Sequence, residues 1–304
     1  MKKIFIAFAA LATIAACNKA EVIEATQDNL IAFDSPFVDY ATKATDKTYS
    51  GEKDLTQFKV YGTVTGVDET TVNVFDGVTV SGTVGAAEWS YDAQYAQYWV
   101  PGADYSFAAV VDADAVAQDA TKMPTVLTYL TDGQKDLLYA TASVTNAAAA
   151  QGVVNFTFAH LLSKAHFTVT SNATGDYSHT IKDIKVSNFE TGTYTIADGS
   201  WGGATSTNIE FGDVEGVTAA TGEKTNETEM LLIPNTETFN VTFTVDLSKD
   251  GALLSTQAKT ISVNTDLVKG NAYNFTIECS VGNPIKFTVL ADPTWTNAGD
   301  VNVQ

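Results

Sequence analysis

Apolar and polar residues alternate in short stretches along most of this chain, and Gly, Asn and Asp separate the stretches. A period of two places alternate side chains on opposite faces, so each stretch predicts a half-buried β-strand. The clearest stretches are residues 58–64, 78–84, 105–111, 153–158, 166–170, 181–189, 229–233, 239–245, 259–263, 273–279 and 285–289. Strands spaced by about ten residues are typical of antiparallel β-sandwiches. The pattern therefore predicts an all-β fold.

The segment before these strands has a pattern of its own. Residues 29–33 alternate and predict a first strand, which is followed by a loop containing Pro36 and by a polar segment, residues 41–53. Further along, residues 112–122 are a weak candidate for a helix and could equally form a loop.

A domain boundary is predicted near residue 162. Residues 160–164 join two strong strands without the Gly or Pro of a tight hairpin. We therefore expect the chain to pass directly from an N-terminal domain, residues 29–162, into a C-terminal domain, residues 163–304.

The first residues have the order of a secretory signal. Lys2 and Lys3 precede an apolar run, residues 4–16, which is too short to span a bilayer as a helix and ends in small residues. Residues 13–17 resemble a bacterial lipobox, which implies that residues 1–16 are a signal peptide and that Cys17 is lipidated. Residues 17–28 would then tether the fold to the outer membrane at the cell surface.

Composition narrows the classes of function. The 304 residues are enough for two domains, and 43 Thr and 30 Val residues favour strands. All 17 basic residues are Lys and stand against 36 acidic residues, which gives a net charge of −19. This charge repels phosphate backbones, so we expect no nucleic-acid partner.

The residues that usually carry catalysis are few. His160, His166 and His179 lack the spacing of a metal site, and residues 112–123 lack the third ligand, the Gly and the Glu of a calcium loop. Residues 199–203 are predicted to be a flexible turn, and Cys279 a small buried core residue. We therefore expect no catalytic residue, metal or cofactor, and no enzymatic activity.

Several short motifs stand in a fixed order along the whole chain. The first motif is the lipobox at Cys17. The others follow at residues 31–33, 41–44, 99–101, 136–140, 156–164, 230–234 and 269–273. The ordered set resembles the fimbrillin superfamily, the subunits of the type V pili of Bacteroidetes. The stretch 156–164, Phe-Thr-Phe-Ala-His-Leu-Leu-Ser-Lys, is similar to the signature at the domain junction of that family.

This resemblance implies a fold and an assembly mechanism. It implies two transthyretin-like β-sandwich domains in tandem, and a structural pilus subunit that supports adhesion. A surface protease would remove residues 29–43, a pro-strand whose Leu30, Ile31 and Phe33 fill a groove. Family members are often cut after Arg or Lys; because this chain has no Arg, Lys43 before Ala44 would be the site, or less favourably Lys47.

A strand of another subunit would then occupy the emptied groove. The donor is expected within residues 285–303, where Ile285, Phe287 and Val289 share one face of a strand. The expected partners are other fimbrial subunits, the maturation protease, the membrane and a surface receptor.

Two alternatives remain open at this point. A surface glycan-binding lipoprotein of a polysaccharide-uptake system also combines a lipobox with β-sandwiches, and its site could include Trp89, Trp99, Trp201 and Trp295, although buried anchors are the commoner role. A non-polymerising tip adhesin of the pilus would need no donor strand.

The predicted anchor can be tested by Cys17→Ser. Without the thiol the precursor cannot receive its diacyl group, so the variant should take up no fatty-acid analogue in metabolic labelling and should not reach the outer surface. Equal labelling of the variant and the wild-type protein would contradict the prediction.

Overall fold

The structure is a computed structural model that describes residues 29–38, 55–66, 68–83, 89–148, 151–226 and 229–292. These residues are 63% strand and 3% helix, so the prediction of an all-β fold is confirmed. No helix among them is long and apolar enough to cross a membrane.

The strands run through both halves of the chain and vary widely in length. They are β1 Phe37–Val38, β2 Gln57–Thr65, β3 Thr71–Ser81, β4 Asp104–Val111, β5 Ala115–Gln118, β6 Pro124–Leu130, β7 Leu138–Val144, β8 Thr157–His160, β9 Ser163–Ser171, β10 Tyr177–Thr195, β11 Ser200–Val217, β12 Lys224–Thr225, β13 Met230–Leu232, β14 Phe239–Lys249, β15 Ala252–Val263, β16 Ala272–Cys279 and β17 Lys286–Asp292. Two short 3-10 helices, η2 Ala93–Tyr95 and η3 Thr131–Gly133, lie between strands.

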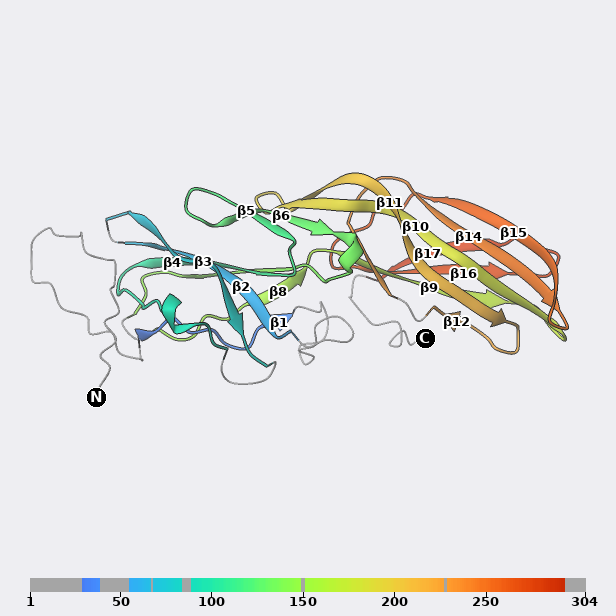
Figure 1. Cartoon of the computed structure of the whole chain (residues 1–304), viewed down its shortest axis with the longest axis horizontal. Helices are drawn as coiled ribbons and strands as arrows, with labels where there is room; N and C mark the ends of the chain where they lie inside the picture. Colours follow the sequence, from blue (N-terminus) through green and yellow to red (C-terminus); the bar gives the residue numbers. More distant parts are fainter. Residues whose placement is uncertain are drawn as a thin grey trace, which may run out of the picture.

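The strands form three sheets in an elongated molecule (Figure 1). The first sheet has the order β1-β8-β7-β4-β2-β3. The second has the order β15-β14-β10-β6-β5, with β11 also paired to β10, and the third runs β12-β9-β16-β17, with β13 also paired to β9. Pairing is antiparallel except between β1 and β8 and between β9 and β16, which are parallel.

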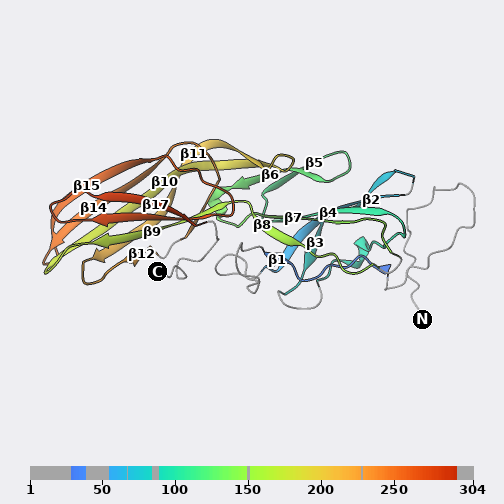
Figure 2. The same ribbon diagram turned by 180° about the vertical axis from the view of Figure 1, so that it is seen from behind.

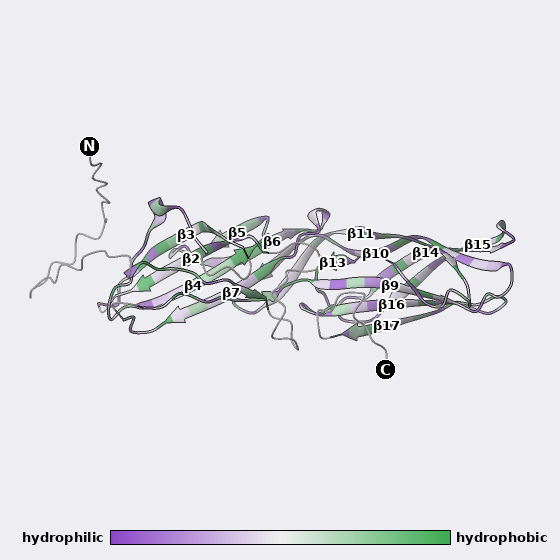
Figure 3. Cartoon of the chain, turned by 90° about the horizontal axis from the view of Figure 1, so that it is seen from below, coloured by the Kyte–Doolittle hydropathy of each residue, from purple (hydrophilic) through white to green (hydrophobic). Residues whose placement is uncertain are grey.

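Alternation along the strands explains where the cores lie. Hydrophobic and hydrophilic residues alternate along β9 and β16, and their apolar members Phe167, Phe275 and Ile277 are fully buried (Figure 3). They pack against Val241 and Phe243 of β14, so the second and third sheets enclose one core. A separate, aromatic-rich core lies under the first sheet.

The strand β10 joins the two halves of the molecule. Its first residues, from Tyr177 to Val186, pair with β14, whereas Thr191–Thr195 pair with β6 from the first half of the sequence. The hairpin β5–β6 therefore extends a sheet of the second half. The domain boundary near residue 162 stays a prediction, because strand pairing crosses it in this way.

Two local predictions are wrong. Residues 112–122 form neither a helix nor a plain loop, because Ala115–Gln118 is strand β5, paired with β6, and Val116 packs against the apolar junction between the halves. Residues 199–203 are more than a turn, because β11 begins at Ser200.

The junction between the halves combines apolar packing with paired polar groups. Leu161 and Leu162 are buried there between strands of both halves. The buried His160 ring lies with its Nδ1 2.7 Å from a carboxylate oxygen of the buried Asp136. The Trp201 indole nitrogen donates to the Leu161 carbonyl over 2.8 Å. Buried polar groups that are paired in this way restrict the halves to one arrangement.

Asn188→Ala should lower the stability of this junction. The buried Asn188 side chain accepts a hydrogen bond from the Ile233 amide (2.8 Å) and donates to its carbonyl (3.1 Å). The carbonyl keeps a second donor, Asn235, but the buried amide is left unsatisfied, at a cost of about 1–3 kcal/mol. Urea unfolding should show this loss, whereas the control Asn208→Ala, at an exposed site on the neighbouring strand, should stay near wild type. Equal midpoints for the two variants would contradict the prediction.

Candidate functional site

The N-terminal segment, residues 29–38, lies in a groove of the first core and closes one side of it. The Ile31 amide donates to the Gln97 carbonyl, and the Trp99 amide donates to the Asn29 carbonyl, each over 2.8 Å. On the other side, the Val154 amide donates to the Ala32 carbonyl over 2.8 Å. The segment is therefore inserted between two backbone stretches that are distant in sequence.

The pairing continues toward β8. The Asp34 amide donates to the Val154 carbonyl (3.1 Å) and the Phe37 amide to the Phe156 carbonyl (2.9 Å), and β1 then pairs with β8 in parallel. The predicted strand at residues 29–33 is thus only partly regular: Leu30 and Phe33 make isolated bridges, and the regular strand β1 follows Pro36.

Phe33 is the centre of the aromatic core of the first half. Its side chain is 1% exposed. It contacts the rings of five other aromatic residues at centroid distances between 5.6 and 6.3 Å, namely Phe58, Phe75, Tyr91, Phe107 and Phe156. Ile31 is fully buried in the same core, whereas Leu30 is only half-buried. The core of the first half therefore depends on a segment from outside its regular strands.

A buried hydrogen bond adds to this apolar contact. The Tyr91 hydroxyl donates to the Ile31 carbonyl over 2.7 Å. Burial raises the pKa of Tyr91 to about 12, so the hydroxyl remains a neutral donor at physiological pH.

The C-terminal strand β17 is the outer strand of the third sheet. It pairs with β16 alone, antiparallel. Ile285, Phe287 and Val289 are half-buried and face the second core, where Phe287 stacks on Phe275 at 6.0 Å. Leu290, on the opposite face, is 63% exposed. The shared face of the first three residues agrees with the sequence, and β17 is docked here as an edge strand of its own chain.

The structure does not bring the two predicted strand sites together. Residues 29–38 belong to the first half and β17 to the second, on separate sheets (Figure 2). Cys17, Lys43, Ala44 and Lys47 lie outside the described residues, so their predicted roles stay predictions.

The remaining candidate residues have structural environments. His166 and His179 are buried, and burial lowers the pKa of each imidazole. Cys279 is buried in the second core as predicted, and burial raises the pKa of its thiol to about 12, which leaves the thiol unreactive at neutral pH. Within the part of the chain that the structure describes, no cluster of three or more His, Cys, Asp or Glu residues could hold a metal.

The three tryptophans that the structure describes do not form an exposed platform for a sugar. Trp89 and Trp99 are buried, and Trp201 is half-buried at the junction. Trp295 lies outside the described residues. Tyr95 and Tyr98 are exposed, but Tyr98 pairs with Leu30 as part of the groove around the N-terminal segment.

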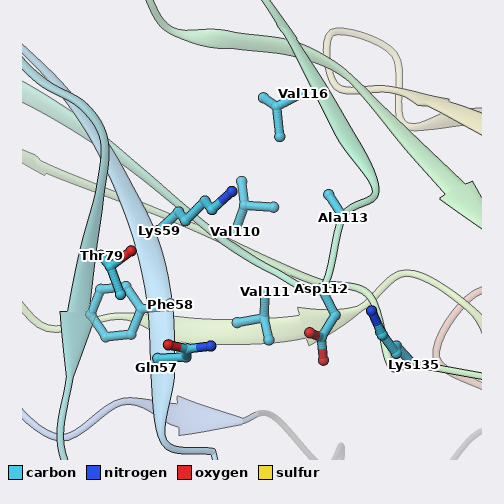
Figure 4. A pocket seen from close by; sticks show the side chains of 10 residues that line it. All are labelled: Gln57, Phe58, Lys59, Thr79, Val110, Val111, Asp112, Ala113, Val116 and Lys135. Carbon is cyan, nitrogen blue, oxygen red and sulfur yellow. The ribbon is translucent and has the colours of Figure 1, made fainter. Parts of the chain in front are cut away.

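Hollows on the described surface differ in size and lining. One, of about 180 Å³, lies between β2, β4 and the start of β5, where Lys59, Asp112 and Lys135 supply charged side chains (Figure 4). It is smaller than the roughly 300–1,000 Å³ of most ligand pockets. Two more open hollows, of about 600 and 300 Å³, have no exposed aromatic ring in their linings; Phe211, in the larger, is fully buried.

Comparison with known proteins bears on the fold and the family. The fimbrillin-like family model matches residues 42–293. A fimbrial protein from Bacteroides vulgatus ATCC 8482 has a structure similar to this one, with a TM-score of 0.67 at 14% identity over 88% of this chain and 100% of that chain. No curated protein matches this sequence.

Two further solved structures are similar. A proposed cell adhesion protein from Bacteroides uniformis ATCC 8492 gives a TM-score of 0.56 at 20% identity, over 88% of this chain and 99% of that one. Another from Bacteroides ovatus ATCC 8483 gives 0.53 at 14% identity, over 88% and 97%. At these identities the likeness supports the β-sandwich fold.

The family match spans most of the chain. This chain belongs to the fimbrillin-like family. The resemblance drawn from the ordered motifs is thereby confirmed, and membership supports a role as a fimbrial subunit.

Phe33→Ala should destabilise the first half strongly. Removing a fully buried aromatic ring costs about 3–5 kcal/mol, because the surrounding rings cannot close the cavity. Phe37→Ala is the matched control, since Phe37 lies on the same segment but is half-buried. Chemical unfolding followed by tyrosine and tryptophan fluorescence measures both. If Phe33→Ala costs no more than Phe37→Ala, Phe33 is not the anchor of the segment.

Proposed function

We propose that this protein is a structural subunit of a cell-surface type V pilus. In this proposal it is exported as an outer-membrane lipoprotein through Cys17, cut after Lys43 and polymerised by donor-strand exchange. Its partners are other fimbrial subunits and the maturation protease, and the assembled fimbria supports adhesion to a surface receptor.

The observation that carries the proposal is the placement of residues 29–38. The segment supplies Ile31 and Phe33 to a core built otherwise from later strands. Each such side chain is worth about 1.5–3 kcal/mol when fully buried. A cut after Lys43 would leave the segment held only by non-covalent contacts, and its loss would open an apolar groove. Such a groove, with unpaired backbone on both sides, is a strong acceptor for a strand.

The apolar residues of β17 are less buried than Ile31 and Phe33 of the N-terminal segment. This difference supports a transfer of β17 into the groove that residues 29–38 would vacate. Phe287 and Val289 are only half-buried where they are docked now, whereas Ile31 and Phe33 are almost completely buried. Moving the apolar face of β17 into a vacated groove would therefore increase the area it buries. Detaching β17 breaks one ladder of hydrogen bonds, with β16, and the groove offers partners on two sides.

The presence of β17 also helps to distinguish a tip subunit from a subunit within the pilus. A tip subunit can dispense with a donor, whereas an edge strand with one apolar face suits a subunit that continues the polymer. The glycan-binding alternative gains no support from the buried tryptophans or from the hollows.

Cleavage should convert the monomer into polymers. Digestion with a Lys-specific protease should cut first near Lys43 or Lys47 and give a fragment that forms ladders on gels run without boiling. A variant ending at Gly282, which lacks the donor, should be cut in the same way and stay folded, but should run as a single monomer band on the same gels. Ladders that persist undiminished in the truncated variant would exclude the C-terminal strand as donor.

Single substitutions on the two faces of β17 test the same prediction more specifically. Phe287→Ser removes an apolar plug and should abolish the ladders, whereas Leu290→Ser, on the exposed face of the same strand, should leave them intact. Circular dichroism melting confirms that both variants are folded before cleavage. Lys43→Gln with Lys47→Gln serves as the uncut control, and ladders from this protein would show that cleavage is not required.

A further inference from the structure

The strand β15 forms a free edge that differs from the other edges of the molecule. Residues 255–263 pair with residues 239–247 of β14 without a register shift, and β15 is the last strand of its sheet (Figure 1). Seven consecutive residues, 252–258, are exposed. Within the described residues, nothing pairs with its outer edge.

Proteins usually protect an edge strand with charges, bulges, prolines or a short length, because its unpaired backbone groups can bind another strand. The other edges described here have such protection. β5 has four residues, β3 carries Asp76 and an irregular register, and β11 carries Glu210, Asp213, Glu215 and register shifts. β17 has Lys286 and Asp292 at its ends. Residues 255–263, Ser-Thr-Gln-Ala-Lys-Thr-Ile-Ser-Val, carry a single charge, Lys259, and have no acid, Pro or Gly.

We propose that β15 pairs with β15 of a second copy of this chain, antiparallel about a two-fold axis. A two-fold interface uses the same strand twice, so its sequence must be compatible with itself. In the register centred on Ala258, Lys259 lies opposite Gln257 and Thr256 lies opposite Thr260. No like charges lie directly opposite one another, the two Lys259 side chains lie diagonally on one face, and paired Thr side chains are favourable across strands.

The charge distribution favours a second copy at this edge over any other face. The chain carries a net charge of −19, so two copies repel each other where acidic residues are exposed. The acid beside the central part of β15 is Asp246 on β14, which is 6% exposed. Its carboxylate is neutralised by Lys182 at 2.6 Å and accepts a hydrogen bond from Thr256 at 2.7 Å. The central part of β15 therefore brings no unpaired carboxylate of β14 or β15 to the interface.

This inference does not depend on the proposed function, because β15 is remote in sequence from both strand-exchange segments. Uncleaved protein should dimerise through β15 even if cleavage produces no polymer. A chain ending at Gly282 should dimerise as well.

Sedimentation equilibrium of the chain from residue 18 onward, uncleaved and without lipid, tests the proposal. Wild-type protein should show a monomer–dimer equilibrium between about 10 µM and about 1 mM. Ala258→Glu and Ala258→Lys each place like charges opposite one another at the two-fold axis, so each should weaken dimerisation by about tenfold or more. Ala204→Glu, at an exposed alanine on β11 of the same sheet, is the matched control and should dimerise as the wild type does.

The two signs of charge distinguish edge pairing from general repulsion. Ala258→Lys lowers the net negative charge, so an association governed by overall charge would become stronger rather than weaker. That result, a wild-type protein that is monomeric throughout the range, or an equal loss in Ala204→Glu would each overturn the proposal.

Disulfide trapping locates the interface directly. Opposed residues of an antiparallel pair have Cα atoms about 4.5–5.5 Å apart, which suits a disulfide. Under oxidised glutathione, Ala258→Cys should give covalent dimers, whereas Ala204→Cys should not, and the buried Cys279 should not react. Dimers trapped equally by both variants would contradict pairing through β15.

Discussion

A strand at the end of a sheet leaves half of its backbone hydrogen-bonding groups without a partner in that sheet, and this constraint governs the whole molecule. The first core is closed by residues 29–38, which are inserted between two backbone stretches. The third sheet ends in β17 and the second in β15. These three edges differ in burial and charge, and the role proposed for each rests on those differences.

The junction between the halves is the part of the molecule that holds these edges in fixed positions. Its apolar residues come from strands of both halves, and β10 contributes to sheet pairing on both sides of it. The pairs Asp136–His160 and Asn188–Ile233 satisfy polar groups that would otherwise be costly to bury. A site in one half is therefore presented at a defined orientation to a site in the other.

Strong alternation made several strands predictable from sequence alone. Alternating stretches coincide closely with β2, β4, β14 and β16. The same period of two predicted the apolar face of β17, on which Phe287 lies. The sequence predicted that Leu30, Ile31 and Phe33 fill a groove; Ile31 and Phe33 are buried, whereas Leu30 is half-buried. The local sequence pattern is sufficient to predict a strand where one face of that strand packs on the core and the other faces solvent.

The missed elements depend on contacts between residues far apart in sequence. β11 contains several glycines that indicate a turn locally, but a Cβ atom at Gly203 would collide with the Phe189 ring of β10. That glycine is needed because of its neighbour across the sheet, and the local sequence pattern does not show which residue that neighbour is. The same holds for β5, whose Val116 is partly buried because pairing with β6 places it at the junction. Strands β6 and β10 pair across the junction and run along the long axis of the molecule (Figure 1). A pulling force along that axis would load the hydrogen bonds of this pairing together in shear, since they lie perpendicular to the strands, instead of unzipping them one by one. The shared strand thus gives the junction mechanical strength that a flexible linker between two separate sandwiches would lack.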